Sequence, residues 1–238
     1  MNKSQSGGRR GFLLKSGVVA AGWLASEHIL TGAVVAAKEQ QAGTDEDVSP
    51  AEDLMREHGA LNRVLLIYDE ELRQIQAKQD VDITVLANAA DIIRHFVEDY
   101  HERLEEDYLF PRFRKANKLV PLVDTLLQQH QAGRRLTEQI RSLAVSATLK
   151  DDGRRQQLSD ALHAFIRMYR PHEAREDTVL FPAFRGLVSH HEYNALGEQF
   201  EKKEDELFGE DGFFKVVNQV SELEKRLGIY ELAQFTPR

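Results

Sequence analysis

Cysteine is absent from this chain of 238 residues, and glycine and proline are scarce, with 15 and 6 occurrences. Without cysteine, neither a disulfide framework nor a thiolate metal site can form, so any metal ion must be bound by imidazole and carboxylate groups. Few glycines and prolines, together with abundant aliphatic and charged residues, favour helices over a β-sandwich or barrel. No segment shows a strand pattern. The sequence therefore predicts an all-α fold.

A basic stripe is also lacking. The whole chain has a formal net charge of −8. Residues 1–37 contain four Lys or Arg and one acidic residue, so the remainder carries a net charge of −11. An acidic domain without a cluster of cations argues against nucleic acid as a partner, because binding to phosphates depends on Lys and Arg.

Residues 1–37 have the features of a targeting segment. The pair Arg9-Arg10 precedes a stretch rich in Ala, Gly and Val that ends in small residues near Ala37. This looks like a twin-arginine export signal. The rival interpretation is an uncleaved membrane anchor, but Glu27 and His28 interrupt the apolar run before it reaches about 20 residues. We expect export by the twin-arginine machinery to the periplasm or beyond, with membrane contact only through an uncleaved leader.

The rest of the chain divides into three parts. Residues 38–50 are polar, acidic and aperiodic, as in a linker. Residues 51–186 hold four segments with apolar residues at helical spacing, separated by short polar connections, which predicts an antiparallel up-and-down four-helix bundle. The second helix is expected to begin at Asp82 or Thr84, either of which can cap it. Residues 187–238 form an extension with additional C-terminal helices that are expected to pack onto the bundle.

One phrase occurs twice. Residues 101–113 read HERLEEDYLFPRF and residues 172–184 read HEAREDTVLFPAF. The repeat extends upstream, because 71 residues separate His101 from His172 and 72 separate His58 from His130. The repeated unit is therefore a pair of helices, with a single histidine on the first helix and the phrase on the second.

The repeat predicts a metal site. Residues four apart lie on one face of a helix, so each phrase points a histidine and a glutamate the same way, and Leu109 and Leu180 extend that face into the core. Burying these groups without a partner is costly, and a cation removes the cost. Nitrogen and oxygen ligands suit iron or manganese, with zinc as an alternative. The predicted ligands are His58, His101, Glu105, His130, His172 and Glu176.

These residues resemble the hemerythrin-like family, also called HHE cation-binding domains. The family pattern is a His on helix one, HxxxE on helix two, His or HxxxH on helix three, and HxxxE or HxxxxD on helix four. The Leu-Phe-Pro after each acidic cluster is typical of bacterial members. The resemblance covers about residues 51–186 and implies a four-helix bundle that binds two non-haem iron ions through the six side chains named above.

The third helix departs from the oxygen-carrying members, because Arg134 stands where HxxxH would place a second histidine. Four histidines and two bridging carboxylates fill about eight of the twelve positions of two octahedra, which leaves room for a small ligand. We therefore expect the centre to bind or react with O2, peroxide or NO, by sensing, detoxification or redox chemistry, rather than to carry oxygen reversibly. A diiron oxidoreductase or peroxidase-like enzyme and a metal-storage or metal-stabilised bundle remain alternatives.

Several residues near the predicted ligands are assigned other roles. Glu102 and Glu173 lie about 100° around the helix from the ligand face, which predicts either a solvated position or a contact beside the ligands; Glu106 and Asp177 are treated alike. Tyr100 and Tyr169 are candidate hydrogen-bond donors to the groups around the ligands. Pro171 should kink its helix. The histidines predicted not to be ligands are His95, His163, His190 and His191.

Overall fold

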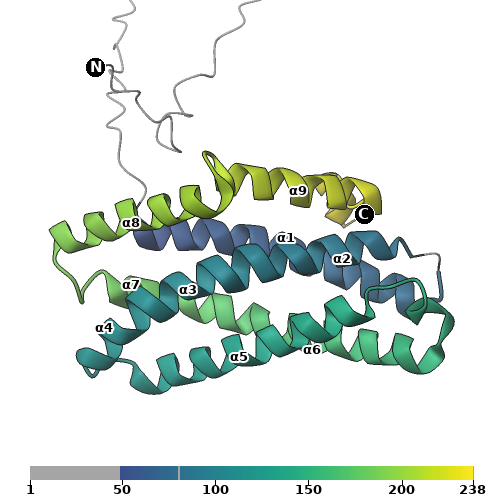
Figure 1. Ribbon diagram of the computed structural model, residues 1–238, viewed down its shortest axis with the longest axis horizontal. Coiled ribbons are helices and arrows are strands. Elements are labelled where there is room, and N and C mark those ends of the chain that lie inside the picture. The colour runs from purple at the N-terminus through teal and green to yellow at the C-terminus, as the bar shows by residue number, and fades with distance from the viewer. Residues whose placement is uncertain (1–48, 80, 238) are drawn as a thin grey trace, which may run out of the picture. The chain divides into compact units, whose positions relative to one another are not determined.

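The computed structural model describes residues 49–79 and 81–237, so the predicted leader and most of the predicted linker lie outside the described residues. All regular structure in the described part is helical, with no strand. Four helical runs lie side by side in alternating directions and form the predicted antiparallel bundle (Figure 1). The all-α prediction is confirmed.

The first and third runs are single helices, and the other two change pitch along their length. The first run is α1 (Pro50–Gln76) and the third is α5 (Val120–Leu143). The second run consists of α2 (Ile83–Ile92), the π-helix η2 (Ile93–His101), α3 (Glu102–Leu104), the π-helix η3 (Glu105–Leu109) and α4 (Phe110–Lys115). After the short 3-10 helix η4 (Thr148–Lys150), the fourth run consists of α6 (Asp152–Arg175), the π-helix η5 (Glu176–Leu180) and α7 (Phe181–Phe184).

Side-chain caps fix where the helices begin. Ser49 accepts a hydrogen bond from the backbone N–H of Glu52 at the start of α1, and Pro50 occupies the first helical position, where no N–H is needed. Asp82 caps α2 as predicted, by accepting the N–H of Thr84 at 3.2 Å. Asp151 caps α6 in the same manner.

The middle of each copy of the repeated phrase forms a wide helical turn. The N–H of Phe110 donates to the carbonyl of Glu105, and that of Phe181 donates to the carbonyl of Glu176, so both bonds span five residues. The prolines that follow have no N–H for the usual bond spanning four residues, which favours a widened turn at these points. Both π-helical turns therefore start at a predicted ligand.

Two further helices, α8 (His190–Phe208) and α9 (Gly212–Leu227), pack against α1, and α9 also contacts α2. Figure 1 shows them together on one side of the bundle, opposite α5 and α6. Gly209, with a φ of 72°, ends α8 and lets the chain turn into α9. A short 3-10 helix, η6 (Leu232–Phe235), follows α9. The prediction that C-terminal helices pack onto the bundle is confirmed.

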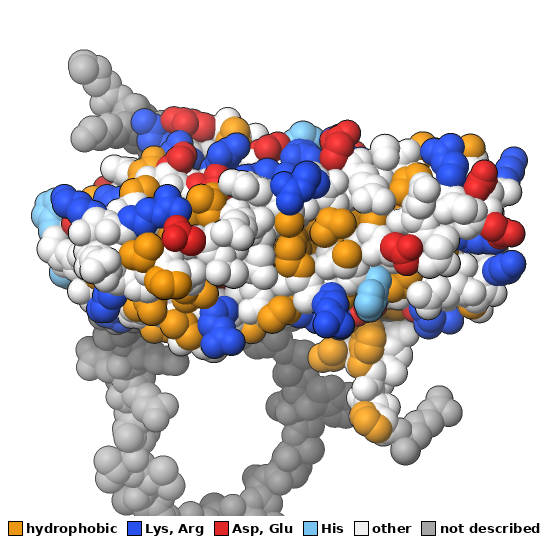
Figure 2. Space-filling view, turned by 90° about the horizontal axis from the view of Figure 1, so that it is seen from below, with side chains coloured by type: hydrophobic (Ala, Val, Ile, Leu, Met, Phe, Trp, Pro, Cys, Tyr) orange, Lys and Arg blue, Asp and Glu red, His pale blue; other side chains and the backbone are white. Residues whose placement is uncertain are grey.

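The surface carries charges of both signs. Figure 2 shows acidic and basic side chains interspersed over one face of the bundle, as expected for a solvated helical surface. Among the described helices, none combines the length and the apolar character that a membrane span requires.

Candidate metal centre

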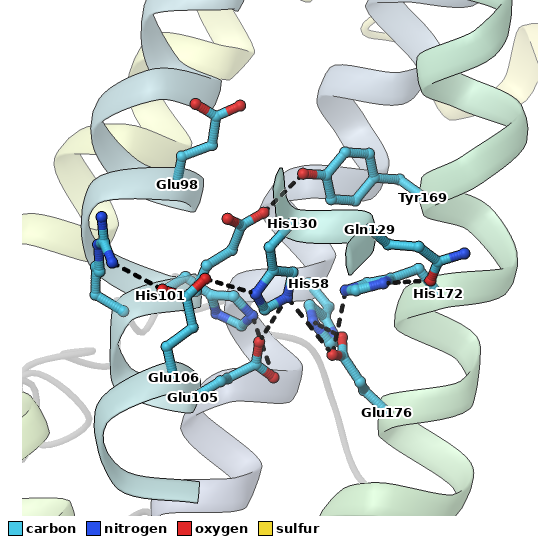
Figure 3. Close-up of polar contacts among 12 residues, drawn as sticks. His58, Glu98, His101, Glu105, Glu106, Gln129, His130, Tyr169, His172 and Glu176 are labelled. Atoms are coloured by element: carbon cyan, nitrogen blue, oxygen red, sulfur yellow. Dashed lines mark hydrogen bonds and ion pairs between the residues drawn. The ribbon is translucent and has the colours of Figure 1, made fainter. Parts of the chain in front are cut away.

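The six predicted ligands meet at one level of the bundle interior (Figure 3). Each is at most 4% exposed. They form two sets. Within each set, the candidate ligand atoms lie within 4.8 Å of one another. The first ligand group is His58, His101 and Glu105, and the second ligand group is His130, His172 and Glu176.

Each glutamate lies between histidines of both groups. One oxygen of Glu105 is 4.0 Å from Nε2 of His101, and the other is 3.3 Å from Nε2 of His130. Glu176 likewise places one oxygen 3.4 Å from Nε2 of His58 and the other 3.1 Å from Nε2 of His172. A carboxylate that offers one oxygen to each group can bridge two cations.

The single histidines are held from outside by the repeated phrase. Nδ1 of His130 is 3.0 Å from Glu106, and Nδ1 of His58 is 2.7 Å from Asp177. Each acid directly follows the inward-facing glutamate of its phrase. A carboxylate at Nδ1 favours the tautomer whose Nε2 lone pair faces inward, which is the form that binds a metal.

The other two histidines are held by residues that sequence analysis missed. Nδ1 of His101 is 2.8 Å from Glu57, and Nδ1 of His172 is 2.9 Å from Gln129. Glu57 and Gln129 directly precede His58 and His130, so the repeat places both at equivalent positions. Aligning the two repeated units would have drawn attention to them, although not to the rings that they contact.

The inward-facing atoms face one another, and most of them make no hydrogen bond. Nε2 of His101, Nε2 of His130 and all four carboxylate oxygens of Glu105 and Glu176 are buried without a hydrogen bond among the described residues. Such orphaned groups are costly in a protein interior. The Nδ1 atom of each of the four histidines already contacts a side chain outside the cluster. The remaining Nε2 and carboxylate oxygen atoms converge inside the bundle, and this donor set suits a transition metal. The residues present therefore fit the cation that the sequence predicted.

Electrostatics agree with a cation at this position. Burial alone lowers the pKa of His58, but its contacts with Asp177 and Glu176 outweigh burial and raise that pKa to about 10. Burial raises the pKa of Glu176, but His172 and His58 outweigh it and hold that pKa well below its usual range. The cluster therefore favours positive charge between its carboxylates, and a metal ion would take the place of protons there.

Glu102 and Glu173 are both buried, so the solvated alternative predicted for them is wrong. One oxygen of Glu102 accepts the hydroxyl of Tyr169 at 2.6 Å, and the other lies 2.8 Å from the guanidinium of Arg134. Arg134 also pairs with Glu106 at 2.8 Å, the acid that holds His130. The residue found in place of a second helix-three histidine thus acts on the centre through two carboxylates. These contacts also confirm Tyr169 as a donor.

The phenylalanines of the phrase pack on the same histidines. Phe110 stacks on His130 with ring centroids 5.4 Å apart, and Phe181 stacks on His58 at 5.5 Å. The last phenylalanines of the two phrases, Phe113 and Phe184, contact each other at 6.2 Å. The repeated Leu-Phe-Pro therefore packs the rings of the site as well as widening the helix.

The four histidines predicted not to be ligands are exposed and lie away from both groups. The side chain of His95 is 64% exposed and lies 3.4 Å from Asp99. It lines a cavity of about 610 Å³ between α2–η2 and α9, which none of the six predicted ligands borders.

Comparisons with known proteins agree with this geometry. The hemerythrin HHE cation binding domain matches residues 49–184, and a second match spans residues 122–226. The uncharacterized proteins Mb2018 of Mycobacterium bovis and Rv1995 of Mycobacterium tuberculosis are each 48% identical over 190 residues, which cover 80% of this chain and 74% of theirs. No solved structure matches the chain. The chain belongs to the hemerythrin HHE cation-binding domain family.

Proposed function

We propose that this protein is an exported non-haem diiron protein whose centre binds or reacts with O2, peroxide or NO. The observation that carries the proposal is the set of buried nitrogen and oxygen atoms without a hydrogen bond that converge from the second, third and fourth helical runs, beside His58 of the first. Iron is the metal that the resemblance to hemerythrin-like proteins implies, and manganese or zinc could use the same imidazole and carboxylate donors.

The positions of the two glutamates support two ions rather than one. Glu105 and Glu176 each direct one oxygen toward each ligand group. In this proposal both glutamates would hold the two ions together, and each group would contribute two histidines. Two bound iron ions would supply one-electron redox chemistry and open positions for a small exogenous ligand.

The protein's own residues orient and enclose the site. Asp177, Glu57, Glu106 and Gln129 each hold one histidine ring by its Nδ1 atom. The phenylalanine rings stacked on two of the histidines cover them with apolar surface. A dry, oriented site of this kind favours a small uncharged ligand over a bulky substrate.

The experiment that tests the proposal is metal analysis of protein purified without oxygen, with absorption spectra before and after addition of O2, peroxide or NO. About two irons per chain, and new charge-transfer bands on addition of one of these ligands, would support the proposal. The matched variants are His101→Ala, which removes a ligand, and His95→Ala, which removes an exposed histidine from the same helical run. Only His101→Ala should lose metal.

The alternative functions give different results in the same experiment. A single zinc ion, or irons whose spectrum no small ligand changes, would favour a structural or storage role. Turnover of peroxide with bound iron would favour a peroxidase-like enzyme. Absence of bound metal, with His101→Ala as stable as the unaltered protein, would contradict the proposal altogether. Export is tested separately, by replacing Arg9 and Arg10 with Lys and locating the protein.

A further inference from the structure

The C-terminal helices reach the metal centre through one buried carboxylate. Glu204 of α8 is 1% exposed. One of its oxygens accepts the backbone N–H of Phe213 at 2.7 Å, at the start of α9. Glu204 therefore joins α8 to α9 from within, and its other oxygen faces η2, the helix that ends at His101.

The hydroxyl of Tyr100 lies between Glu204 and the carboxylate that holds that histidine, and its single proton is shared among three acceptors. The hydroxyl of Tyr100 lies 3.5 Å from Glu204 and 3.2 Å from Glu57, and also 3.5 Å from the carbonyl of Phe200. The second oxygen of Glu57 is 2.8 Å from Nδ1 of His101. Tyr100, which the sequence predicts to be a donor beside the ligands, contacts the carboxylate that orients His101.

Close packing between α8, α9 and η2 surrounds Tyr100 and Glu204. The ring of Phe208, near the end of α8, contacts Tyr100 edge-on with centroids 5.6 Å apart. Gly212 lies so close that an added Cβ would be 2.6 Å from Cβ of Phe208 and 3.0 Å from Glu204. Any larger residue at this turn would therefore displace the carboxylate or the helix that carries it.

Charge couples the same groups. Carboxylate oxygens of Asp53, Glu57 and Glu204 lie within 4.8 Å of one another, and all three side chains are buried. At this separation in a protein interior, a change in the charge of one carboxylate alters the preferred positions of the other two. Glu57 consequently depends on Glu204 for its placement as well as on His101.

We propose that the α8–α9 pair is part of the support of the metal centre, with Glu204 as the residue that positions His101 through Tyr100 and Glu57. This inference rests on the proposed metal-binding function. It applies to the first ligand group only, because the residue equivalent to Tyr100 in the second unit is Pro171, which has no hydroxyl to donate. The C-terminal extension thereby gains a role beyond covering the bundle.

Glu204→Gln tests the proposal, because it keeps the shape of the side chain and removes its charge. Its matched control is Glu224→Gln. Glu224 lies on α9, is also buried, and binds Arg63 of α1, so it docks the same helix pair without touching Tyr100 or Glu57. Anaerobic titration with cobalt(II) alone reports both the affinity and the ligand-field bands of each position.

We expect Glu204→Gln to weaken the first ligand group and shift its ligand-field bands, while the second group keeps its affinity. Loss of an outer partner of a metal-bound histidine typically costs about 10- to 100-fold in affinity, and this more distant change should fall at the lower end. Gly212→Ala should move the same bands without any change of charge, because its Cβ would press on Phe208, which packs on Tyr100, and on Glu204. Glu224→Gln should lower stability and leave the bands in place.

Two outcomes would overturn the inference. One is an unchanged cobalt spectrum in Glu204→Gln, and the other is an equal shift in Glu224→Gln, which would mean that general loosening of α9 is responsible. If the unaltered protein itself binds no cobalt, the proposed function fails first. The two failures are therefore distinguishable.

Discussion

The two ligand groups are alike inside and different outside. In the first group, the outer nitrogens of both histidines face carboxylates, Asp177 and Glu57. In the second group, His172 faces the neutral amide of Gln129, and His130 faces Glu106, whose charge is shared with Arg134. A carboxylate at the outer nitrogen makes an imidazole a stronger ligand. The first group should therefore hold a cation more tightly.

The difference between the two ligand groups extends to the residue four positions after each single histidine. Arg134 has Asn62 as its equivalent in the first unit, 72 residues earlier. Asn62 is neutral, and it hydrogen-bonds the carboxylate of Glu173 and the backbone carbonyl of His58. The side chains that would contact a metal are repeated in kind, whereas two pairs of equivalent residues around them, Glu57 with Gln129 and Asn62 with Arg134, differ in charge. Two positions with the same ligand types can thus differ in affinity and in redox behaviour, because the surround sets the electron density of the ligands.

The largest expected effect tests the part that the two groups share. Glu105→Gln and Glu176→Gln should each abolish metal binding at both positions, because each carboxylate faces both groups. Metal at a thousandfold excess over its dissociation constant adds about 4 kcal/mol to the free energy of unfolding. That increment should vanish in both variants, measured by metal content and by unfolding with and without metal. Retention of one ion by either variant would show that its glutamate serves a single position.

The next prediction compares the two units away from the centre. Glu71 of α1 is fully buried, its oxygens have no hydrogen-bond partner among the described residues, and its equivalent in the second unit is Leu143. Burial raises the pKa of Glu71 to about 8, and Asp82 and Glu70 add to the shift. Since this pKa exceeds the unfolded value of 4.5, the folded state binds the extra proton between these limits, and stability falls as the pH rises through them.

Glu71→Leu removes that proton and places the same residue in both units. The variant should gain stability over the unaltered protein, and the gain should increase from pH 5 to pH 8, where it reaches on the order of 3 kcal/mol. Urea unfolding of chelator-treated protein at the two pH values measures it without interference from metal. A gain that is equal at both values would show that Glu71 is ionised in the folded state throughout.

The fold and the inner residues were accessible from sequence because both depend on short spacings. Helical periodicity defined the four runs, and two copies of a phrase with His and Glu four residues apart indicated which face carries the ligands. The twofold repeat then identified the single histidines His58 and His130, which no local pattern marks.

The residues that hold the ligands from outside could not be predicted from the sequence in the same way. Glu57 contacts a histidine 44 residues further along the chain, and Gln129 contacts one 43 residues away, so each pairing depends on how two helices are rotated against each other. Glu102 was placed off the ligand face by ideal helix geometry, yet it is buried, because Tyr169 and Arg134 from neighbouring helices cover that side. Contacts between helices, rather than positions along one helix, decide these roles.

A smaller effect is expected from giving the histidines of both ligand groups the same kind of outer partner. Gln129→Glu gives His172 the carboxylate partner that the other three histidines already have. We expect the affinity of the second ligand group to rise about tenfold, at the lower end of the range for such partners. Two unequal steps in a calorimetric titration with cobalt(II) should then approach one.

Glu57→Gln is the reciprocal change and should weaken the first group by a similar factor. If both variants leave the two steps as they were, the outer hydrogen bonds do not cause the difference between the groups. If the unaltered protein already shows two equal steps, the contrast drawn from Gln129 and Arg134 has no energetic consequence.

The smallest expected effect tests whether packing around the centre is as symmetric as the inner residues. Phe110→Leu and Phe181→Leu each remove an aromatic ring stacked on a single histidine, at nearly equal distances of 5.4 and 5.5 Å. Aromatic pairs contribute about 0.5–1.5 kcal/mol beyond their buried area, so both variants should lose about 1 kcal/mol of unfolding free energy. Urea unfolding of the metal-free proteins measures this loss. A loss confined to one variant would mean that the asymmetry of Arg134 and Asn62 reaches the rings themselves, because the stacking geometry alone predicts equal losses.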